Sequence, residues 1–158
     1  MSVAVSMSSL PPAGLATWRN KPRTLVVDDS PTILQAICSL LEHHKVVELV
    51  GRAESGTEAI AIVDDLKPEL VLIDADMPGM SGLRTSLLLA QSAPETRVVL
   101  MSMDTTPQFQ RACAGCGAYA VIYKPKFLSE LLTLLNPEPT KDWSRTNAPR
   151  RGLKKRRL

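Results

Sequence analysis

The chain has 158 residues, of which 44% are hydrophobic, so it can form one globular domain with a sizeable core, and a disordered or fibrous protein is excluded. The formal net charge of +3 is uneven, because residues 141–158 carry eight Lys or Arg against one Asp, whereas the remainder is mildly acidic. No stretch approaches the roughly 20 apolar residues of a membrane-spanning helix, and residues 1–14 lack the basic start of a secretion signal, so we expect a cytoplasmic protein.

The predicted strands follow an N-terminal extension. Residues 1–22 are rich in Ser, Ala and Pro without periodicity, which predicts a flexible segment. From residue 23 onward, short β-branched or aliphatic runs alternate with helical patterns. The runs that predict strands are 25–27, 46–50, 70–73, 98–101 and 120–123. The third and fourth are apolar throughout, as strands covered on both faces should be.

Five helices are predicted between and after these strands. Each begins at a capping side chain, a glycine or a proline. The signals are Ser30-Pro31, Ser55 with Glu58, Gly82, Thr106-Pro107 and Lys124-Pro125. Apolar residues at helical spacing predict the buried faces. In chain order these are Ile33, Leu34, Ile37, Leu40 and Leu41; Ala59, Ile62, Val63 and Leu66; Leu83, Leu87 and Ala90; Phe109, Ala112, Cys113 and Cys116; and Leu128, Leu131, Leu132 and Leu135.

Strict alternation of five strands and five helices predicts right-handed crossovers and a parallel sheet with helices on both faces. We therefore expect an α/β protein: a flavodoxin-like (βα)5 doubly wound sheet in three α/β/α layers over residues 23–137. The basic residues 138–158 then form a disordered tail. The strand order does not follow from the sequence.

Polar residues stand just after four of the predicted strands. They are Asp28 and Asp29 after the first, Asp74 after the third, Ser102 after the fourth and Lys124 after the fifth. These strand ends share one edge of a parallel sheet, and flavodoxin-like sheets bind ligands there, between the first and third strands. Three carboxylates at one place repel one another and need a cation, and an all-oxygen site suits Mg²⁺.

Asp74 is the candidate nucleophile of this site. With a cation and Lys124 offsetting its charge, a phosphoryl group can approach the carboxylate and form an aspartyl-phosphate. Ser102 can then donate a hydrogen bond to a phosphoryl oxygen. The sequence thus predicts phosphoryl transfer to a side chain.

The pattern resembles the response-regulator receiver domains of two-component signalling, from about residue 24 to residue 136. The matching motifs are Val-Asp-Asp-Ser at 27–30, Ile-Asp-Ala-Asp-Met-Pro-Gly-Met-Ser-Gly at 73–82, Ser102, Gly-Ala at 117–118 and Lys-Pro at 124–125. Each motif is common alone, but their order, spacing and position at strand ends together are specific to the family.

The resemblance implies a role for each site residue. Asp74 is the phosphoacceptor, Asp29 and Asp74 are direct Mg²⁺ ligands, Asp28 is a ligand through water, and the main-chain carbonyl of Asp76 is a further ligand. Ser102 is the switch hydroxyl and Lys124 its charge partner. Apart from self-phosphorylation and slow loss of the phosphoryl group, no enzymatic activity is implied.

The resemblance also implies the partners. The phosphoryl group comes from a phosphohistidine on a sensor histidine kinase or a phosphotransfer protein. Nothing after Asn136 has the length of an effector domain, which indicates a stand-alone receiver, either a monomer or a switch-dependent dimer. Its fourth helix, fifth strand and fifth helix form the surface for a downstream protein.

Two positions depart from the family pattern. Val121 stands three residues before Lys124, where the family often has an aromatic residue; Tyr119 and Tyr123 share its predicted strand face and are candidate substitutes. Met103 follows Ser102 where the family usually has a small residue. Both concern the switching step rather than the acceptor.

Other motifs have plainer interpretations. Cys113 and Cys116 form a Cys-x-x-Cys pair, yet they lie on the predicted apolar face of a helix, which favours buried thiols over redox or zinc chemistry. His43 and His44 suit a solvent-facing helix end. The basic tail is more typical of a solvated, disordered segment than of a nucleic-acid-binding one, because it has no interleaved aromatic residues.

Two other functions remain open at this point. A haloacid-dehalogenase-type phosphatase also has an Asp-x-Asp after an apolar strand, as at Asp74 and Asp76, but here Asp28 and Asp29 precede it and no room is left for a substrate cap. A binding module with the receiver fold and output through the basic tail would work without phosphorylation. The complete set of site residues argues against this module.

Overall fold

The chain folds around one parallel five-stranded sheet. The computed structural model describes residue 18 and residues 21–136. The strands are β1 (Arg23–Val27), β2 (Glu48–Ala53), β3 (Leu70–Asp74), β4 (Arg97–Ser102) and β5 (Ala120–Tyr123). Their order is β2-β1-β3-β4-β5, and every neighbouring pair is parallel. The predicted flavodoxin-like fold is confirmed, and the strand order reverses direction between β1 and β3.

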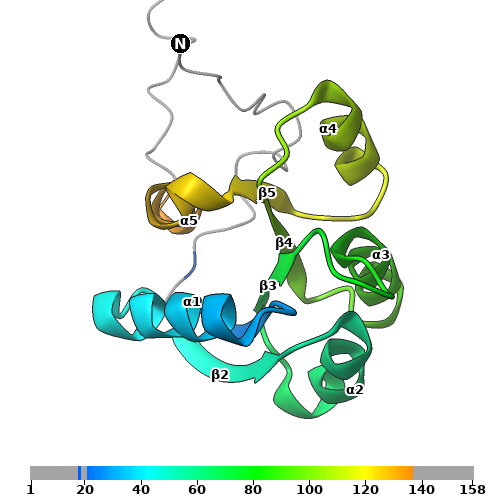
Figure 1. Cartoon of the computed structure of the whole chain (residues 1–158). Coiled ribbons are helices and arrows are strands. Elements are labelled where there is room, and N and C mark those ends of the chain that lie inside the picture. Colours follow the sequence, from blue (N-terminus) through cyan, green and yellow to red (C-terminus); the bar gives the residue numbers. More distant parts are fainter. Residues whose placement is uncertain (1–17, 19–20, 137–158) are drawn as a thin grey trace, which may run out of the picture.

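Helices cover both faces of the sheet (Figure 1). They are α1 (Pro31–His44), α2 (Gly56–Leu66), α3 (Gly82–Ser92), α4 (Pro107–Ala114) and α5 (Phe127–Leu135), with a short 3₁₀ turn (Lys124–Lys126) before α5. One core cluster joins the sheet to α1 and α5, and the other joins it to α2, α3 and α4. The molecule thus has the expected three layers. Among the described helices, none has the length and apolar character needed to cross a membrane.

Local capping fixes where four helices begin. Ser30, Ser55, Ser81 and Thr106 each accept a hydrogen bond from the backbone N–H three residues ahead. The capping box at Ser55 and Glu58 departs from the usual form. The Ser55 hydroxyl accepts from the N–H of Glu58, but the Glu58 carboxylate accepts from the N–H of Glu54 rather than from that of Ser55. Helix α5 has no capping side chain and instead follows the 3₁₀ turn.

The central strands divide their side chains between the two core clusters. In β1, Leu25 and Val27 pack toward α2 and α3, whereas Val26 packs toward α1 and α5. All five residues of β3 are buried, which confirms the prediction of a strand covered on both faces. The segment before β1 also contributes, since Trp18 packs against the cluster beneath α1 and α5.

The second predicted strand is displaced. The sequence indicated residues 46–50, but β2 runs from Glu48 to Ala53 and includes Gly51 and Arg52. Pairing with β1 determines this, because the ladder continues to the pair Val27–Ala53 after a register shift at Thr24 and Leu25. A glycine fits within this strand because the Leu66 side chain occupies the space of a Cβ at Gly51.

Some predicted helix faces are wrong in detail. In α3 the buried residues are Gly82, Thr85, Ser86 and Leu89, whereas Leu87 is exposed. Small polar residues are buried there because α3 lies close to α2: a Cβ at Gly56 would collide with the Thr85 hydroxyl. Close packing, not hydropathy, selects this face.

The same correction applies to three other helices. Helix α5 buries Phe127, Leu131 and Leu135 while Leu132 is exposed, because it begins at Phe127 and that residue packs inward. In α1 the predicted stripe residue Ile33 is exposed, whereas its neighbour Leu34 is buried. In α4 Ala112 is exposed, and the helix ends at Ala114, before Cys116.

The cysteines and histidines behave as the plainer interpretations predicted. Cys38, Cys113 and Cys116 are buried free thiols. Burial raises the pKa of the Cys113 thiol to about 11, so it is uncharged at neutral pH. His43 and His44 are exposed in the last turn of α1. The basic tail lies outside the described residues, as does most of the predicted N-terminal extension.

Candidate functional site

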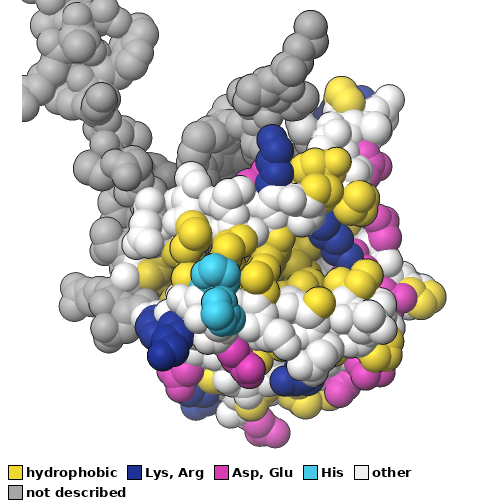
Figure 2. Space-filling view, turned by 60° about the vertical axis from the view of Figure 1, so that its left-hand side comes forward, with side chains coloured by type: hydrophobic (Ala, Val, Ile, Leu, Met, Phe, Trp, Pro, Cys, Tyr) yellow, Lys and Arg dark blue, Asp and Glu magenta, His cyan; other side chains and the backbone are white. Residues whose placement is uncertain are grey.

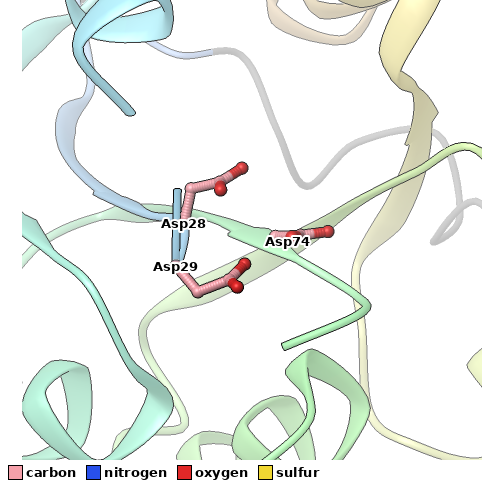
Figure 3. Close-up of side chains that lie close together, drawn as sticks. All are labelled: Asp28, Asp29 and Asp74. Carbon is pink, nitrogen blue, oxygen red and sulfur yellow. The ribbon is translucent and has the colours of Figure 1, made fainter. Parts of the chain in front are cut away.

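Three aspartates from two strand ends meet at the carboxyl edge of the sheet. Asp28 and Asp29 follow β1, and Asp74 is the last residue of β3. One carboxylate oxygen from each lies within 4.8 Å of the others. Figure 3 shows the three side chains extending from β1 and β3 toward a common space. Asp28 is fully buried and Asp74 is 6% exposed, whereas Asp29 is exposed. The sequence predicted this convergence from strand ends alone.

Lys124 connects two of these carboxylates. Its Nζ lies 3.1 Å from Asp28 Oδ2 and 3.3 Å from Asp74 Oδ1. The lysine side chain is 18% exposed, so both ion pairs are partly shielded from water. The ammonium offsets part of the negative charge that β1 and β3 bring together. It reaches the site from the 3₁₀ turn that follows β5.

The ionisation of this site reflects burial and pairing. Burial raises the pKa of Asp74, and the charge of Asp28 adds to this, while the N–H of Asp76 and the Lys124 ammonium oppose it. For Lys124, burial alone would lower the pKa, but the hydrogen bond to Asp28 and the charges of Asp74 and Asp28 raise it overall. Lys124 therefore remains a cation at neutral pH.

The two oxygens of the Asp74 carboxylate differ. Oδ1 is paired with Lys124 and also accepts a hydrogen bond from the N–H of Asp76 at 3.2 Å. Oδ2 has no hydrogen-bond or ion-pair partner within residues 21–136. One oxygen is thus fixed and the other is available to a ligand.

Ser102 is buried at the end of β4, one position beyond Met101, which pairs with Asp74 in the ladder. Its hydroxyl oxygen accepts a hydrogen bond of 2.9 Å from the N–H of Asp104. The Asp104 carboxylate accepts in turn from the N–H of Thr106 at 2.7 Å, which lowers the pKa of Asp104. Thr106 caps α4. Hydrogen bonds therefore connect the site to the start of α4.

The family comparison agrees with this geometry. The model of the response regulator receiver domain matches residues 24–136. The chain belongs to the response regulator receiver domain family.

Relatives of this receiver domain include whole response regulators. It is 34% identical over 110 residues to the response regulator GacA of Pseudomonas protegens, covering 70% of this chain and 52% of that protein. It is 30% identical over 105 residues to a protein-glutamate methylesterase/protein-glutamine glutaminase of Methanospirillum hungatei, covering 65% of this chain and 30% of that protein. The chain thus spans about half or less of the length of these relatives.

A solved structure with the same fold is the response regulator domain of Thermotoga maritima CheB. It superimposes with a TM-score of 0.66 at 27% sequence identity, and the match covers 75% of this chain and 96% of that domain. The similarity therefore extends over a complete receiver domain.

Two residues of the receiver site were not singled out from the sequence. Asp104 connects Ser102 to the cap of α4, and its spacing of two residues from Thr106 is a signal of a hydrogen-bonded turn. Gly82 was predicted only as a helix start, yet a Cβ there would lie 2.2 Å from the main-chain oxygen of Asp74. Helix α3 thus begins directly against the end of β3.

The prediction that Tyr119 shares a strand face with Val121 is wrong. Val121 packs toward the cluster of α2, α3 and α4, but Tyr119 packs against the opposite cluster. The two-residue period holds only within a strand, and β5 begins at Ala120, after Tyr119. Met103 is 62% exposed beside the buried Ser102.

The cluster also fits a hard divalent cation. Its donors are carboxylate oxygens, the kind of ligand that Mg²⁺ takes, and the exposed Asp29 leaves an open side for bound waters. Two of the carboxylates are buried, and among the described residues Lys124 is the one cation that pairs with them, so a second positive charge is favourable.

Proposed function

We propose that this receiver domain accepts a phosphoryl group on Asp74 in a phosphorelay, from a phosphohistidine on a sensor histidine kinase or phosphotransfer protein. The observation that carries the proposal is the position of Lys124 Nζ, within 3.3 Å of both the buried Asp28 and Asp74. In the transfer, the P–N bond to the donor imidazole breaks and a P–O bond to Asp74 forms. Relatives described as response regulators support the same general role.

The chain's own residues prepare Asp74 for this step. The N–H of Asp76 and the Lys124 ammonium hold Oδ1, so Oδ2 is the attacking oxygen. Lys124 also stabilises negative charge on the incoming phosphoryl oxygens. Asp28, Asp29, Asp74 and the main-chain carbonyl of Asp76 would hold Mg²⁺. When bound, the ion neutralises charge on the phosphoryl oxygens.

An apolar groove beside the acceptor suits the donor protein. It has a volume of about 340 Å³ and is lined by Lys124, Phe127 and the α1 residues Ile33, Ala36, Ile37 and Leu40. Figure 2 shows hydrophobic side chains gathered in a band beside the histidines of α1. Because Lys124 belongs to both groove and site, a helix docked here would bring its phosphohistidine next to Asp74.

Ser102 supplies the response to phosphorylation. Its oxygen now accepts from the N–H of Asp104, which leaves its proton free to be donated to a phosphoryl oxygen. A movement of Ser102 toward Asp74 would pull on the hydrogen bonds through Asp104 to the cap of α4. We infer that α4, β5 and α5 form the surface that changes its affinity for a downstream protein.

The test is intact-protein mass spectrometry after incubation with acetyl phosphate and Mg²⁺, and separately with a phosphohistidine donor. We expect one metal-dependent phosphoryl adduct, absent in Asp74→Asn and retained in Asp64→Asn, whose side chain is exposed on α2. An adduct that persists in Asp74→Asn would place the acceptor elsewhere. No adduct from either donor would favour the binding module that works without phosphorylation.

The phosphatase alternative has less support. The family match to the receiver domain covers the aspartate cluster, Ser102 and Lys124 together. Release of phosphate from simple esters is not expected, and multiple turnover of such esters by the wild-type chain would revive the alternative.

A further inference from the structure

The short turn that carries Lys124 is supported differently from the starts of the other helices. Helices α1 to α4 each begin at a capping side chain. Neither the 3₁₀ turn (Lys124–Lys126) nor α5 has such a cap, and a helix start without a cap is less well fixed. Yet the Lys124 ammonium lies within 3.3 Å of both Asp28 and Asp74. The backbone at Lys124 is therefore held by other contacts.

The side chain of Glu130 supplies one of these contacts. Its Oε2 accepts a hydrogen bond of 2.8 Å from the main-chain N–H of Tyr123, the last residue of β5. The bond is partly buried and joins residues that are seven positions apart. Hydrogen bonds to an ionised acceptor are stronger than those between neutral groups. The bond therefore closes a loop of the chain that contains Lys124 itself.

Glu130 is in turn fixed by its helix. It lies in the first turn of α5, where the partial positive charge of the helix N-terminus favours a carboxylate. Phe127 and Leu131, on the same helix, are buried in the core cluster beneath α1 and α5. The Ser129 hydroxyl donates to the carbonyl oxygen of Lys126 at 3.1 Å, which ties the 3₁₀ turn to the helix. The Glu130 carboxylate thus connects the end of β5 to a helix that is anchored in the core.

The position of the Lys124 ammonium is sensitive to this connection. Tyr123 directly precedes Lys124, so a shift of the Tyr123 main chain moves the backbone from which the lysine side chain extends. The ammonium makes ion pairs of 3.1 and 3.3 Å with carboxylates that follow two different strands. A displacement of about 1 Å would lengthen at least one of them beyond hydrogen-bonding distance.

We propose that Glu130 is a positioning residue of the acceptor site. By holding the N–H of Tyr123, its carboxylate sets the backbone at Lys124 and so the place of the ammonium between Asp28 and Asp74. Glu130 acts through Lys124 and takes no part in the transfer itself. Its effect on phosphoryl transfer rests on the function proposed above, whereas its effect on the place of Lys124 does not.

The test compares Glu130→Ala with Glu130→Gln and with the matched control Glu42→Ala, which removes an exposed carboxylate from α1. Ala is well tolerated in a helix, and Gln keeps a side-chain oxygen that can accept the hydrogen bond. NMR of the full chain gives two signals that need no phosphoryl donor. In Glu130→Ala, the amide proton of Tyr123 should shift upfield as its hydrogen bond is lost, and the Cε signal of Lys124 should shift as the ammonium moves. Both signals should stay near their wild-type positions in Glu130→Gln and Glu42→Ala.

The rate of adduct formation on Asp74 measures the consequence for transfer. With acetyl phosphate and Mg²⁺, Glu130→Ala should react about tenfold more slowly than the wild type. Glu130→Gln should keep most of the rate. In a Lys124→Met background, Glu130→Ala should cause no further loss, because the residue through which Glu130 acts has been removed.

Unchanged Lys124 signals in Glu130→Ala would overturn the proposal, whatever the rate. A loss of rate that recurs in full in the Lys124→Met background would also overturn it, since Glu130 would then act by another route. If the wild type itself forms no adduct, the function proposed above fails, and the Lys124 signal still decides whether Glu130 positions the lysine.

Discussion

Among the described residues, Lys124 is the cation that pairs with the aspartate cluster. It pairs with Asp28, which is fully buried, and with Asp74, which is almost fully buried. Removing one partner of a buried pair costs more than the pair contributed, because a charge is left without compensation. The lysine therefore has a structural role besides the one we propose for it in phosphoryl transfer.

Replacing Lys124 with Met should lower the free energy of unfolding by about 2 kcal/mol at neutral pH without metal, because two carboxylates lose their counter-charge. Urea unfolding measures the difference. Lys126→Met is the matched control, since Lys126 is exposed two residues away, and it should change stability by less than about 0.5 kcal/mol. Equal losses in the two variants would show that the pairing with Asp28 contributes nothing.

At the scale of elements, local signals predicted where helices begin and most of the positions they bury, but not the buried face of α3. Ser30 and Ser55 identified helix starts, because a cap depends only on residues three positions apart. The burial of Thr85 and Ser86 was not predictable, since it depends on the close approach of α2 at Gly56. Strand ends likewise located Asp28 and Asp74, whereas the hydrogen bond between Asp104 and Ser102 required the folded loop.

The contact between α3 and β3 leads to a second prediction. A Cβ at Gly82 would lie 2.2 Å from the Asp74 main-chain oxygen, so the backbone of the acceptor would have to move. Gly82→Ala should destabilise the fold by about 2 kcal/mol or more and reduce phosphoryl transfer to Asp74. Thermal unfolding and adduct formation measure the two effects.

Gly115→Ala is the control for this change. Gly115 has an ordinary helical backbone, and a Cβ there would lie 3.7 Å from its nearest neighbour outside the chain's adjacent residues. Its stability and adduct formation should remain close to those of the wild type. A Gly82→Ala protein that unfolds and reacts like Gly115→Ala would contradict the close packing of α3 on the acceptor strand.

At the scale of the whole molecule, we predict that the cluster of like charges makes stability depend on Mg²⁺. Mg²⁺ that binds only the folded state should raise the free energy of unfolding by about 1.4 kcal/mol at ten times its Kd. Thermal unfolding at increasing Mg²⁺ measures this gain. Asp29→Asn should largely abolish the gain, while being slightly more stable than wild type without metal, because one repelling charge is removed.

Asp64→Asn should keep the full gain from Mg²⁺, since Asp64 is exposed on α2 and does not belong to the cluster. A melting temperature of the wild type that does not respond to Mg²⁺ would argue against a metal site at Asp28, Asp29 and Asp74. The response does not require a phosphoryl donor, so it tests metal binding at the site separately from phosphoryl transfer.

A pocket of about 280 Å³, at the edge of the sheet opposite the aspartates, brings both ends of the described chain together. Trp18 and Lys21 lie on its wall, and so does Asn136, although more than 110 positions separate them in sequence. A domain whose ends meet can be spliced into a surface loop of another protein through short linkers. It can also be circularly permuted, with new ends opened at an exposed loop such as that around Glu95. In such a chimaera the acceptor at Asp74 would face away from the host, at the far edge of the sheet.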